Sequence, residues 1–284
     1  MQKVDVSIIA ANYNNGAYLD DFFESIKTSS VEPNEIIIVD DGSTDDSLSK
    51  LKEKEEQFPN LIIIPLKKNI GFANALNVGI KHSQSEFILR VDPDDVIFQD
   101  RIKIQHAFLT QNKNISVVGS NATYFAKSKE LFNTNFPNKF ETIKKRYIKG
   151  EHGILHGTVM IRRDAMKKYQ YRQEFVPAED YGLFGRMIAD GHIFANINQP
   201  LTGVRIHENS VSNDLPYNTI KTTFVLRDKI FNTKSKKILI YCTYLNLKFY
   251  RKFLFKKQNI IKYLFLILSI TFRPDKVFRR IFNR

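Results

Sequence analysis

Residues 35–47 read EIIIVDDGSTDDS and residues 86–96 read EFILRVDPDDV. Each stretch begins with a short run rich in apolar residues, which is typical of a strand buried in a sheet, and then changes abruptly to carboxylates. Similar apolar runs lie at residues 6–11 and 61–65. Stretches with the apolar spacing of a helix separate these runs, and strands that alternate with helices form mostly parallel sheets. We therefore predict an α/β fold, with helices flanking a mostly parallel sheet.

Polar side chains follow three of the predicted strands, at the point where each strand ends. Residues 12–16 read NYNNG, residues 40–47 read DDGSTDDS and residues 92–95 read DPDD. Ligands bind at the carboxyl ends of the strands in sheets of this kind. The sequence therefore predicts that the three segments form one polar rim.

The carboxylates of Asp92, Asp94 and Asp95 have two interpretations. Carboxylates brought this close repel one another, and a hard divalent cation with oxygen ligands relieves the repulsion. A solvated acidic turn would explain the same spacing. The chain contains neither a G-x-G-x-x-G motif nor a P-loop to bind phosphates, so a bound Mn²⁺ or Mg²⁺ is the natural means of holding a diphosphate.

The segment that begins with Asp40 and Asp41 also has two interpretations. Asp-Gly-Ser after a strand is typical of a tight turn, and Asp45 or Ser47 could cap the helix that follows. Turn and cap do not explain why two carboxylates follow the strand directly. A binding role for Asp40 and Asp41 therefore remains open at this point.

The charge is distributed unevenly along the 284 residues. The net charge is +13, but residues 216–284 contain 17 Lys and Arg against only Asp228 and Asp275. The rest of the chain is therefore nearly neutral. The single cysteine, Cys242, excludes an internal disulfide and a thiolate metal cluster. No signal peptide is expected, because residue 6 already begins an apolar strand with no charged segment before it.

Seven segments in order resemble glycosyltransferase family 2, a group of inverting enzymes with the GT-A fold. The resemblance covers residues 4–212, and the tail lies outside it. It implies transfer of a sugar from a nucleoside-diphosphate donor, with a divalent cation as cofactor. The segments are VSIIAANYNN from Val6, EIIIVDDGSTDDS from Glu35, NIGFANALNVGI from Asn69, EFILRVDPDDV from Glu86, HGTVMIRR from His156, AEDYGLFGRM from Ala178 and RIHENSVS from Arg205.

The resemblance implies a donor site along the polar rim. Ala11, Tyr13 and Asp41 match the wall that binds the base, where a carboxylate accepts from the uracil N–H, and Asp40 lies beside them. Asp92-Pro93-Asp94 matches the DXD motif. There Asp94 would bind the metal, and Asp92 would contact the ribose or support the metal through water. His207 matches a further metal contact, although a lone histidine is as often a surface residue.

The resemblance also implies the catalytic base. Asp180 matches the carboxylate that takes the proton of the acceptor hydroxyl, and Glu179 beside it would bind hydroxyls of the donor or acceptor. The alternative is that Asp180 is only a helix N-terminal residue, where the helix dipole favours a negative charge. His156 would line the acceptor side or lie in the core.

The basic composition of the C-terminal tail predicts a structural region separate from the first domain. We expect a GT-A domain at residues 1–215 and a basic, aromatic, helical region at 216–284. The apolar run at 263–272 is shorter than the roughly 20 residues that span a bilayer, which favours helices lying on an anionic membrane surface. A nucleic-acid partner, suggested by charge alone, and a packed helical subdomain are the alternatives. The acidic rim and the lack of a nucleic-acid module argue against the former.

Together these features predict an enzyme, an inverting hexosyltransferase. It would transfer a hexose from a UDP-sugar to a lipid-linked saccharide, such as one linked to undecaprenyl diphosphate, in surface polysaccharide biosynthesis. The predicted location is cytoplasmic, peripheral to the membrane. The alternative is a non-catalytic or nucleotidyltransferase-like protein that binds a nucleotide sugar, which would have no need of the Glu179-Asp180 pair.

Overall fold

The computed structural model describes residues 1–127, 129–207, 216–255, 260–274 and 276. The chain divides into two compact units, Met1–Arg205 and Ile206–Arg284. The boundary predicted between residues 215 and 216 falls at the edge of a segment outside the described residues, so it stays a prediction. Each unit is described by itself below.

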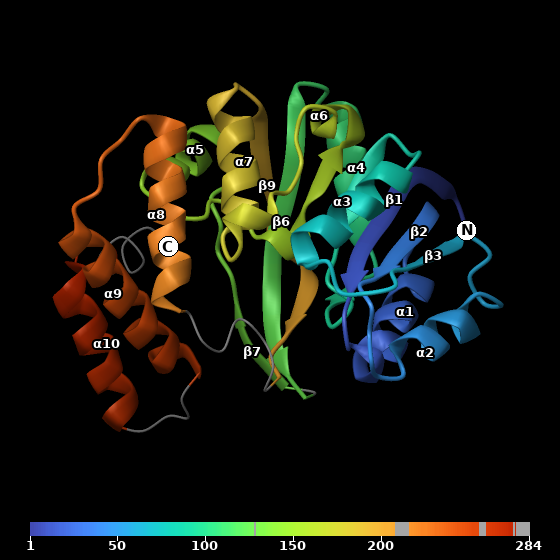
Figure 1. Ribbon diagram of the computed structural model, residues 1–284, viewed down its shortest axis with the longest axis horizontal. Helices are drawn as coiled ribbons and strands as arrows, with labels where there is room; N and C mark the ends of the chain where they lie inside the picture. The colour runs from blue at the N-terminus through green and yellow to red at the C-terminus, as the bar shows by residue number, and fades with distance from the viewer. Residues whose placement is uncertain (128, 208–215, 256–259, 275, 277–284) are drawn as a thin grey trace. The chain divides into compact units, whose positions relative to one another are not determined.

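The first unit is built on a nine-stranded sheet, with the order β3-β2-β1-β4-β8-β6-β9-β5 and with β7 paired to β6 (Figure 1). The four strands from β3 to β4 are parallel, as predicted. β8 is antiparallel to both of its neighbours, so the second half of the sheet is mixed. The strands are β1 (Lys3–Asn12), β2 (Glu32–Asp40), β3 (Leu61–Pro65), β4 (Phe87–Arg90), β5 (Val96–Ile97), β6 (Ile115–Ala126), β7 (Lys129–Asn133), β8 (Met160–Arg162) and β9 (Ile193–Arg205).

Helices flank this sheet, as the apolar spacing between the strands predicts. The α-helices of the first unit are α1 (Leu19–Lys27), α2 (Ser47–Lys54), α3 (Phe72–His82), α4 (Arg101–Gln111), α5 (Phe140–Ile148), α6 (Arg163–Met166) and α7 (Glu179–Ala189). Three short 3₁₀ helices are η1 (Gly16–Tyr18), η2 (His156–Thr158) and η3 (Gln173–Phe175).

Strand β1 is buried on both faces, because its alternate side chains serve two different layers. Val6 and Ile8 belong to the same apolar cluster as Phe22 of α1. Ile9 points to the other face, where α3 runs along β1 and β2 (Figure 1). A Cβ on Gly79 of α3 would lie only 2.7 Å from Cγ2 of Ile9, so this glycine lets the helix approach the sheet closely.

The register brings the polar segments to one edge of the sheet. Asn12 at the end of β1 pairs with Asp40 at the end of β2. On the other side of β1, Ile9 pairs with Arg90, the last residue of β4. The loop that begins at Asp92 therefore starts beside the end of β1. This placement confirms the expectation that the three strand ends share one rim.

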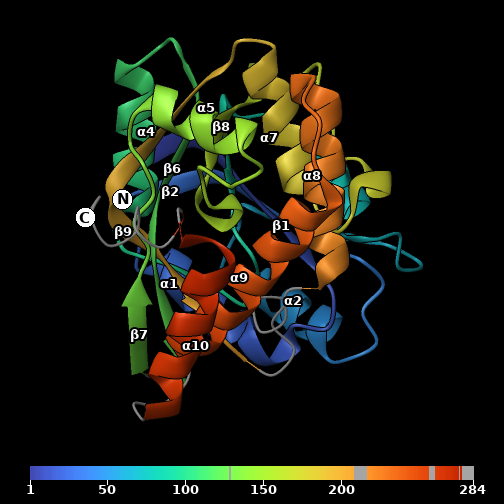
Figure 2. The same ribbon diagram turned by 90° about the vertical axis from the view of Figure 1, so that its left-hand side faces the viewer.

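The second unit consists of helices, as predicted for the basic tail. They are α8 (Tyr217–Phe231), α9 (Lys237–Phe255) and α10 (Ile260–Phe272). α9 packs against both of the others, and most extensively against α10 (Figure 2). Ile220 and Phe224 of α8 meet Ile240 of α9 in a small apolar core. Among the described residues, no helix is both long enough and apolar enough to span a bilayer.

Candidate active site

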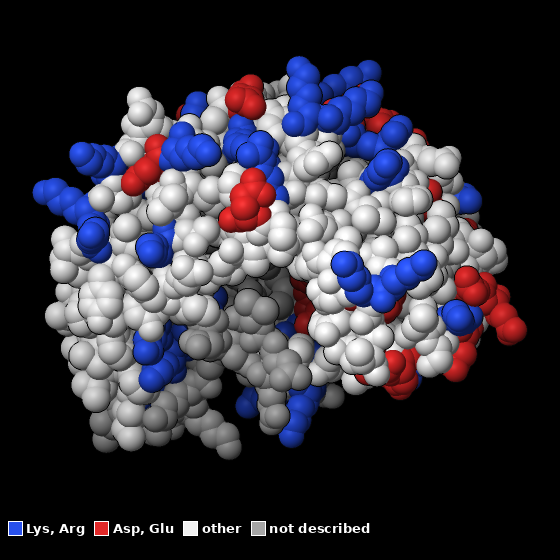
Figure 3. All heavy atoms as spheres, in the orientation of Figure 1, with Lys and Arg blue, Asp and Glu red and all other residues white. Residues whose placement is uncertain are grey.

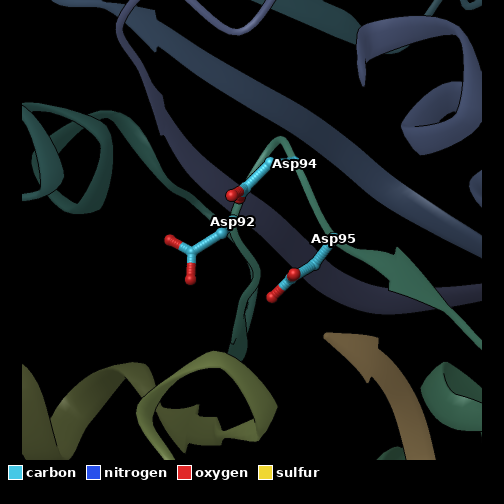
Figure 4. A group of neighbouring side chains, drawn as sticks. All are labelled: Asp92, Asp94 and Asp95. Atoms are coloured by element: carbon cyan, nitrogen blue, oxygen red, sulfur yellow. The ribbon is translucent and has the colours of Figure 1, made fainter. Parts of the chain in front are cut away.

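The acidic loop, residues 92–95, follows β4 directly. The backbone N–H of Asp95 donates to the carbonyl of Asp92 at 3.1 Å, which closes the loop into a tight turn. The turn brings the carboxylates of Asp92, Asp94 and Asp95 together, with one oxygen of each within 4.8 Å of the others (Figure 4). Asp95 is buried and the other two are partly buried. The three residues therefore form a cluster of oxygen donors at the rim.

Burial makes it costly for this cluster to be fully charged. It raises the pKa of Asp95 well above its ordinary value, and the neighbouring charges of Asp94 and Asp92 raise it further. Burial also raises the pKa of Asp92, although the positive charge of Arg90 opposes the shift. Carboxylate oxygens crowded in this way fit a hard divalent cation such as Mg²⁺ or Mn²⁺. The donor set is therefore compatible with the predicted metal.

Two buried arginines lie beneath the acidic loop. The guanidinium of Arg90, the last residue of β4, donates to Asp92. Arg101 of α4 is fully buried and donates through Nη2 to the carbonyl of Arg90 at 2.7 Å. Burial, together with the charge of Arg90, lowers the pKa of Arg101 to about 9. Apolar spacing and motifs indicate a role for neither residue, although an arginine inside an apolar strand, as Arg90 is, is itself a signal.

The carboxylates at the end of β2 are tied to the backbone and to neighbouring side chains. Asp40 accepts from Asn12 Nδ2 at 2.8 Å and from Ser43 Oγ at 2.7 Å. Asp41 accepts from the backbone N–H groups of Ile70 at 2.7 Å and Gly71 at 3.0 Å, just before α3. Both aspartates are buried. These bonds explain why two carboxylates follow the strand directly, and a base-binding role for either stays a prediction.

The other two residues predicted at the base-binding wall differ in exposure. Tyr13 follows β1 and is 46% exposed, so its ring is accessible to a planar ligand. Ala11 lies one residue before the end of β1 and is buried. Because Ala11 pairs with Val39 in the sheet, both residues stand next to the end of β2. The structure thus brings them to the same rim as Asp40 and Asp41.

Glu179 and Asp180 form the first turn of α7, as the sequence predicts. Oε2 of Glu179 is buried and has no hydrogen-bond partner among the described residues. Burial raises the pKa of Glu179 to about 7, with further contributions from Asp180 and Asp92. One carboxylate oxygen of Asp180 accepts from the backbone N–H of Tyr181 at 2.7 Å, and the other lies 3.6 Å from Nδ1 of His152.

The acidic loop and the start of α7 share one electrostatic environment. The pKa of Glu179 responds to the charges of Arg90 and Asp92. Burial raises the pKa of Tyr171, and the charges of both Asp180 and Asp92 raise it further. The residues predicted as donor site and base therefore lie in the same region of the first unit.

Tyr171 is held at the centre of this region. Its hydroxyl lies 2.6 Å from Nε2 of His156, and the side-chain amide of Asn77 in α3 accepts from its backbone N–H and donates to its carbonyl. Burial lowers the pKa of His156 well below its ordinary value, so the ring is neutral and can share a hydrogen bond with the tyrosine. A Cβ on Gly157 would lie 3.1 Å from Nη1 of Arg90, so a glycine here lets η2 approach the acidic loop.

His207, the second predicted metal ligand, belongs to the second unit. Its contact with the metal stays a prediction for that reason. The remainder of the segment RIHENSVS, residues 208–212, lies outside the described residues.

Comparisons with known proteins agree with the geometry. A family model described as "Glycosyl transferase family 2" matches residues 7–170. UDP-Gal:alpha-D-GlcNAc-diphosphoundecaprenol beta-1,3-galactosyltransferase of Escherichia coli is 26% identical over 207 residues, which is 70% of this chain and 73% of the relative.

Two solved structures resemble the chain over most of its length. TarS of S. aureus in complex with UDP-GlcNAc has a TM-score of 0.65 at 20% identity, covering 96% of this chain and 80% of that one. Mannosyltransferase PcManGT from Pyrobaculum calidifontis, in complex with GDP-Man and Mn²⁺, has a TM-score of 0.60 at 15% identity, covering 94% and 73%. At such identities the likeness bears on the fold alone, and it confirms the predicted α/β fold of GT-A type.

The raised pKa of Glu179 predicts how Glu179→Gln changes stability with pH. The folded protein keeps this proton between about pH 4.5 and 7 while the unfolded chain has lost it, so wild-type stability falls as the pH rises through that window. Glutamine removes the effect. At pH 8 the variant should be more stable than wild type by on the order of 1–3 kcal/mol, with little difference at pH 4.5.

Urea unfolding, followed by circular dichroism in the presence of a chelator, measures this difference. Glu174→Gln is the matched control, because Glu174 is exposed a few residues before α7. Parallel stability curves for wild type and Glu179→Gln across this pH range would contradict the assignment.

Proposed function

Because the chain belongs to glycosyl transferase family 2, we propose that it is an inverting hexosyltransferase that uses a UDP-sugar and a lipid-linked saccharide. The observation that carries this function is the shared environment of the acidic loop and the Glu179-Asp180 pair. A protein that only bound a nucleotide sugar would gain nothing from a carboxylate pair at the start of α7. The non-catalytic alternative has no such observation in its favour.

The residues of the polar rim and the donors of two similar proteins support the donor that we propose. Tyr13 is exposed beside the end of β2, where Ala11, Asp40 and Asp41 would complete a wall for the base. Asp92 and Asp94 would hold the cation and, through it, the diphosphate. The E. coli relative uses UDP-Gal, and the TarS structure contains UDP-GlcNAc. A UDP-hexose is therefore the donor that we propose.

The acceptor is proposed from the same relative and from the second unit. The E. coli enzyme acts on a sugar linked to diphosphoundecaprenol. A similar lipid-linked saccharide, used to build a surface polysaccharide, fits a chain with a basic helical unit. Reaction at the cytoplasmic face of the membrane would bring this acceptor and the nucleotide sugar together.

Asp180 is the base in the proposed reaction. It takes the proton of the acceptor hydroxyl as that oxygen forms a bond to the anomeric carbon, and the electron pair of the breaking bond goes to the diphosphate oxygen. The start of α7 favours its negative charge, the backbone N–H of Tyr181 donates to one of its oxygens, and His152 lies near the other. When bound, the cation neutralises the charge that develops on the leaving diphosphate.

Glu179 has a separate role in this scheme. With a pKa of about 7 its carboxyl group is protonated in part of the molecules at neutral pH. Its buried Oε2, which has no hydrogen-bond partner in the part of the chain that the structure describes, can then donate to, or accept from, a sugar hydroxyl. We assign it to orienting the sugar rather than to proton transfer, because Asp180 already has a positioning partner.

Peripheral membrane association is the proposed role of the second unit. On α10 the polar Ser269 is fully buried against Asn246 of α9, whereas Ile261, Leu264 and Ile267 are 49%, 51% and 59% exposed. A helix that faces water normally buries its apolar side chains and exposes its polar ones, and α10 does the opposite. An apolar face in a strongly basic unit is typical of a helix that lies in the surface of an anionic membrane.

Replacing the base should stop transfer without preventing binding of the donor. Asp180→Asn keeps the shape and loses the proton acceptor, so kcat should fall by at least about 100-fold. The dissociation constant of the UDP-sugar, measured by calorimetry, should change little. Asp190→Asn, at the other end of α7, is the control. Near-normal turnover by Asp180→Asn would refute its role.

Transfer should also require the acidic loop and a divalent cation. Release of UDP should need Mn²⁺ or Mg²⁺ and stop with chelator. Asp94→Asn should raise the metal concentration for half-maximal activity at least about tenfold, since even loss of an outer-sphere partner commonly costs 10–100-fold. Asp100→Asn, exposed at the start of α4, serves as control. Full activity in chelator would contradict the metal assignment.

The membrane proposal predicts binding to vesicles of phosphatidylcholine with phosphatidylglycerol. Sedimentation with these vesicles should weaken as the salt concentration rises, because surface charge attraction is screened. Ile267→Ser should reduce the affinity roughly tenfold, since each buried CH₂ contributes about 0.8 kcal/mol. Ile62→Ser, at an exposed position of β3 in the first unit, is the control. Equal affinities for the two variants would count against α10 as the contact.

A further inference from the structure

A cavity of about 510 Å³ lies within the second unit, between the α8–α9 connection, the start of α9 and the end of α10. Its polar lining is cationic. Lys234 and Lys236 come from the connection and Arg273 from the residue after α10. No acidic side chain is among the described residues that line it. On the face shown in Figure 3, Lys and Arg side chains gather over the same connection.

The rest of the lining is apolar. Ile238 and Leu239 come from the first turn of α9, and Phe272 from the last turn of α10. Ile238 is 66% exposed, whereas the adjacent Leu239 packs against the small core of this unit. A lining that combines cations with apolar side chains makes a site for an amphipathic anion, rather than for an inorganic ion alone.

The connection that carries the two lysines is held in shape by Asp228 of α8. Its Oδ1 accepts from Nη2 of Arg227 at 2.6 Å and from Thr233 Oγ1 at 2.8 Å, and its Oδ2 accepts from the backbone N–H of Ser235 at 2.8 Å. Burial would raise the pKa of Asp228, but these hydrogen bonds outweigh it and lower the pKa. The carboxylate is therefore ionised and fixed at neutral pH.

The hydrogen bonds to Asp228 fix the backbone that carries Lys234 and Lys236. The hydroxyl of Thr233 and the backbone N–H of Ser235 donate to the carboxylate, and Lys234 and Lys236, which alternate with these two residues, are exposed at the cavity. On the opposite side, Nη1 of Arg273 donates to Thr243 Oγ1 at 2.8 Å, which fixes the third cation on α9. Cations placed in advance lose less conformational entropy when an anion binds.

From this arrangement we infer that the cavity binds the phosphate headgroup of an anionic lipid. Lys234, Lys236 and Arg273 contact the phosphate, and the first carbons of the acyl chain lie against Ile238, Leu239 and Phe272. The inference rests on the proposed membrane association and deepens it. The proposed membrane association would then depend on one specific site for a lipid headgroup, and not only on general attraction between surface charges.

Two charge-matched variants of the full-length protein test the site. Lys234→Gln/Lys236→Gln removes two charges at the cavity, whereas Lys221→Gln/Lys229→Gln removes two exposed charges from α8. Affinity is measured by sedimentation with vesicles of phosphatidylcholine containing phosphatidylglycerol. We expect the cavity variant to lose about 30-fold or more and the control about threefold or less. Equal losses would mean diffuse charge attraction and overturn the site.

Asp228→Asn provides a second test with an opposite sign. It makes the unit more positive by one charge, so diffuse attraction would strengthen binding to the same vesicles. A preorganised site would instead bind several-fold more weakly, because the connection is released. Thermal unfolding by circular dichroism checks that the variant is folded. Tighter binding by a folded Asp228→Asn variant would overturn the inference; weaker binding supports it.

Further experiments distinguish a lipid phosphate from free phosphate. They also distinguish failure of the lipid site from failure of the membrane association or of the transferase activity. If inorganic phosphate displaces the wild-type protein from vesicles while chloride of equal ionic strength does not, the cavity is a site for the free ion and the lipid assignment is wrong. Absence of wild-type vesicle binding would overturn the membrane association as well. Transfer to a water-soluble acceptor should be unchanged in the cavity variant, because Lys234 and Lys236 are not among the residues proposed to bind the donor or the metal or to act as the base.

Discussion

Repulsion among carboxylates at the end of one buried strand is the constraint on which the candidate site depends. The turn after β4 forces Asp92, Asp94 and Asp95 together, and burial prevents water from relieving their charge. Arg90 offsets part of it through Asp92 and is itself held in place, through its carbonyl, by Arg101. The remaining negative charge is what makes the rim attractive to a divalent cation.

The same constraint extends from the loop to α7. Burial raises the pKa of Glu179 to about 7, and the charges of Asp180 and Asp92 add to the shift. Cation binding at the loop would lower the cost of ionising Glu179, and removal of the cation would raise it. The acidic loop and the start of α7 are thereby coupled through charge. In the proposed reaction, binding of a metal and a diphosphate at the loop would therefore change the charge state of Glu179.

The two units differ in which side chains they bury. The first unit gathers acidic groups on an apolar sheet, where Tyr171 is fixed by His156 and Asn77. The helical unit buries polar contacts such as Asn246 with Ser269 and leaves apolar side chains outside. A strongly basic composition and an outward apolar face suit a surface of anionic lipid. Under the proposed membrane association, the uneven charge along the chain would separate sugar transfer in the first unit from lipid binding in the second.

The sequence by itself determined the four parallel strands β1 to β4, the helices between them, the acidic loop and the position of Glu179 and Asp180 at the start of α7. These features follow from apolar spacing and turn chemistry, which act over a few residues. It did not reveal the role of Arg90, the bracing of Tyr171 by Asn77, or the backbone groups bound by Asp41. Asn77 and Tyr171 are 94 residues apart in the chain. Only the tertiary structure decides such contacts, because they depend on which distant segments burial brings together.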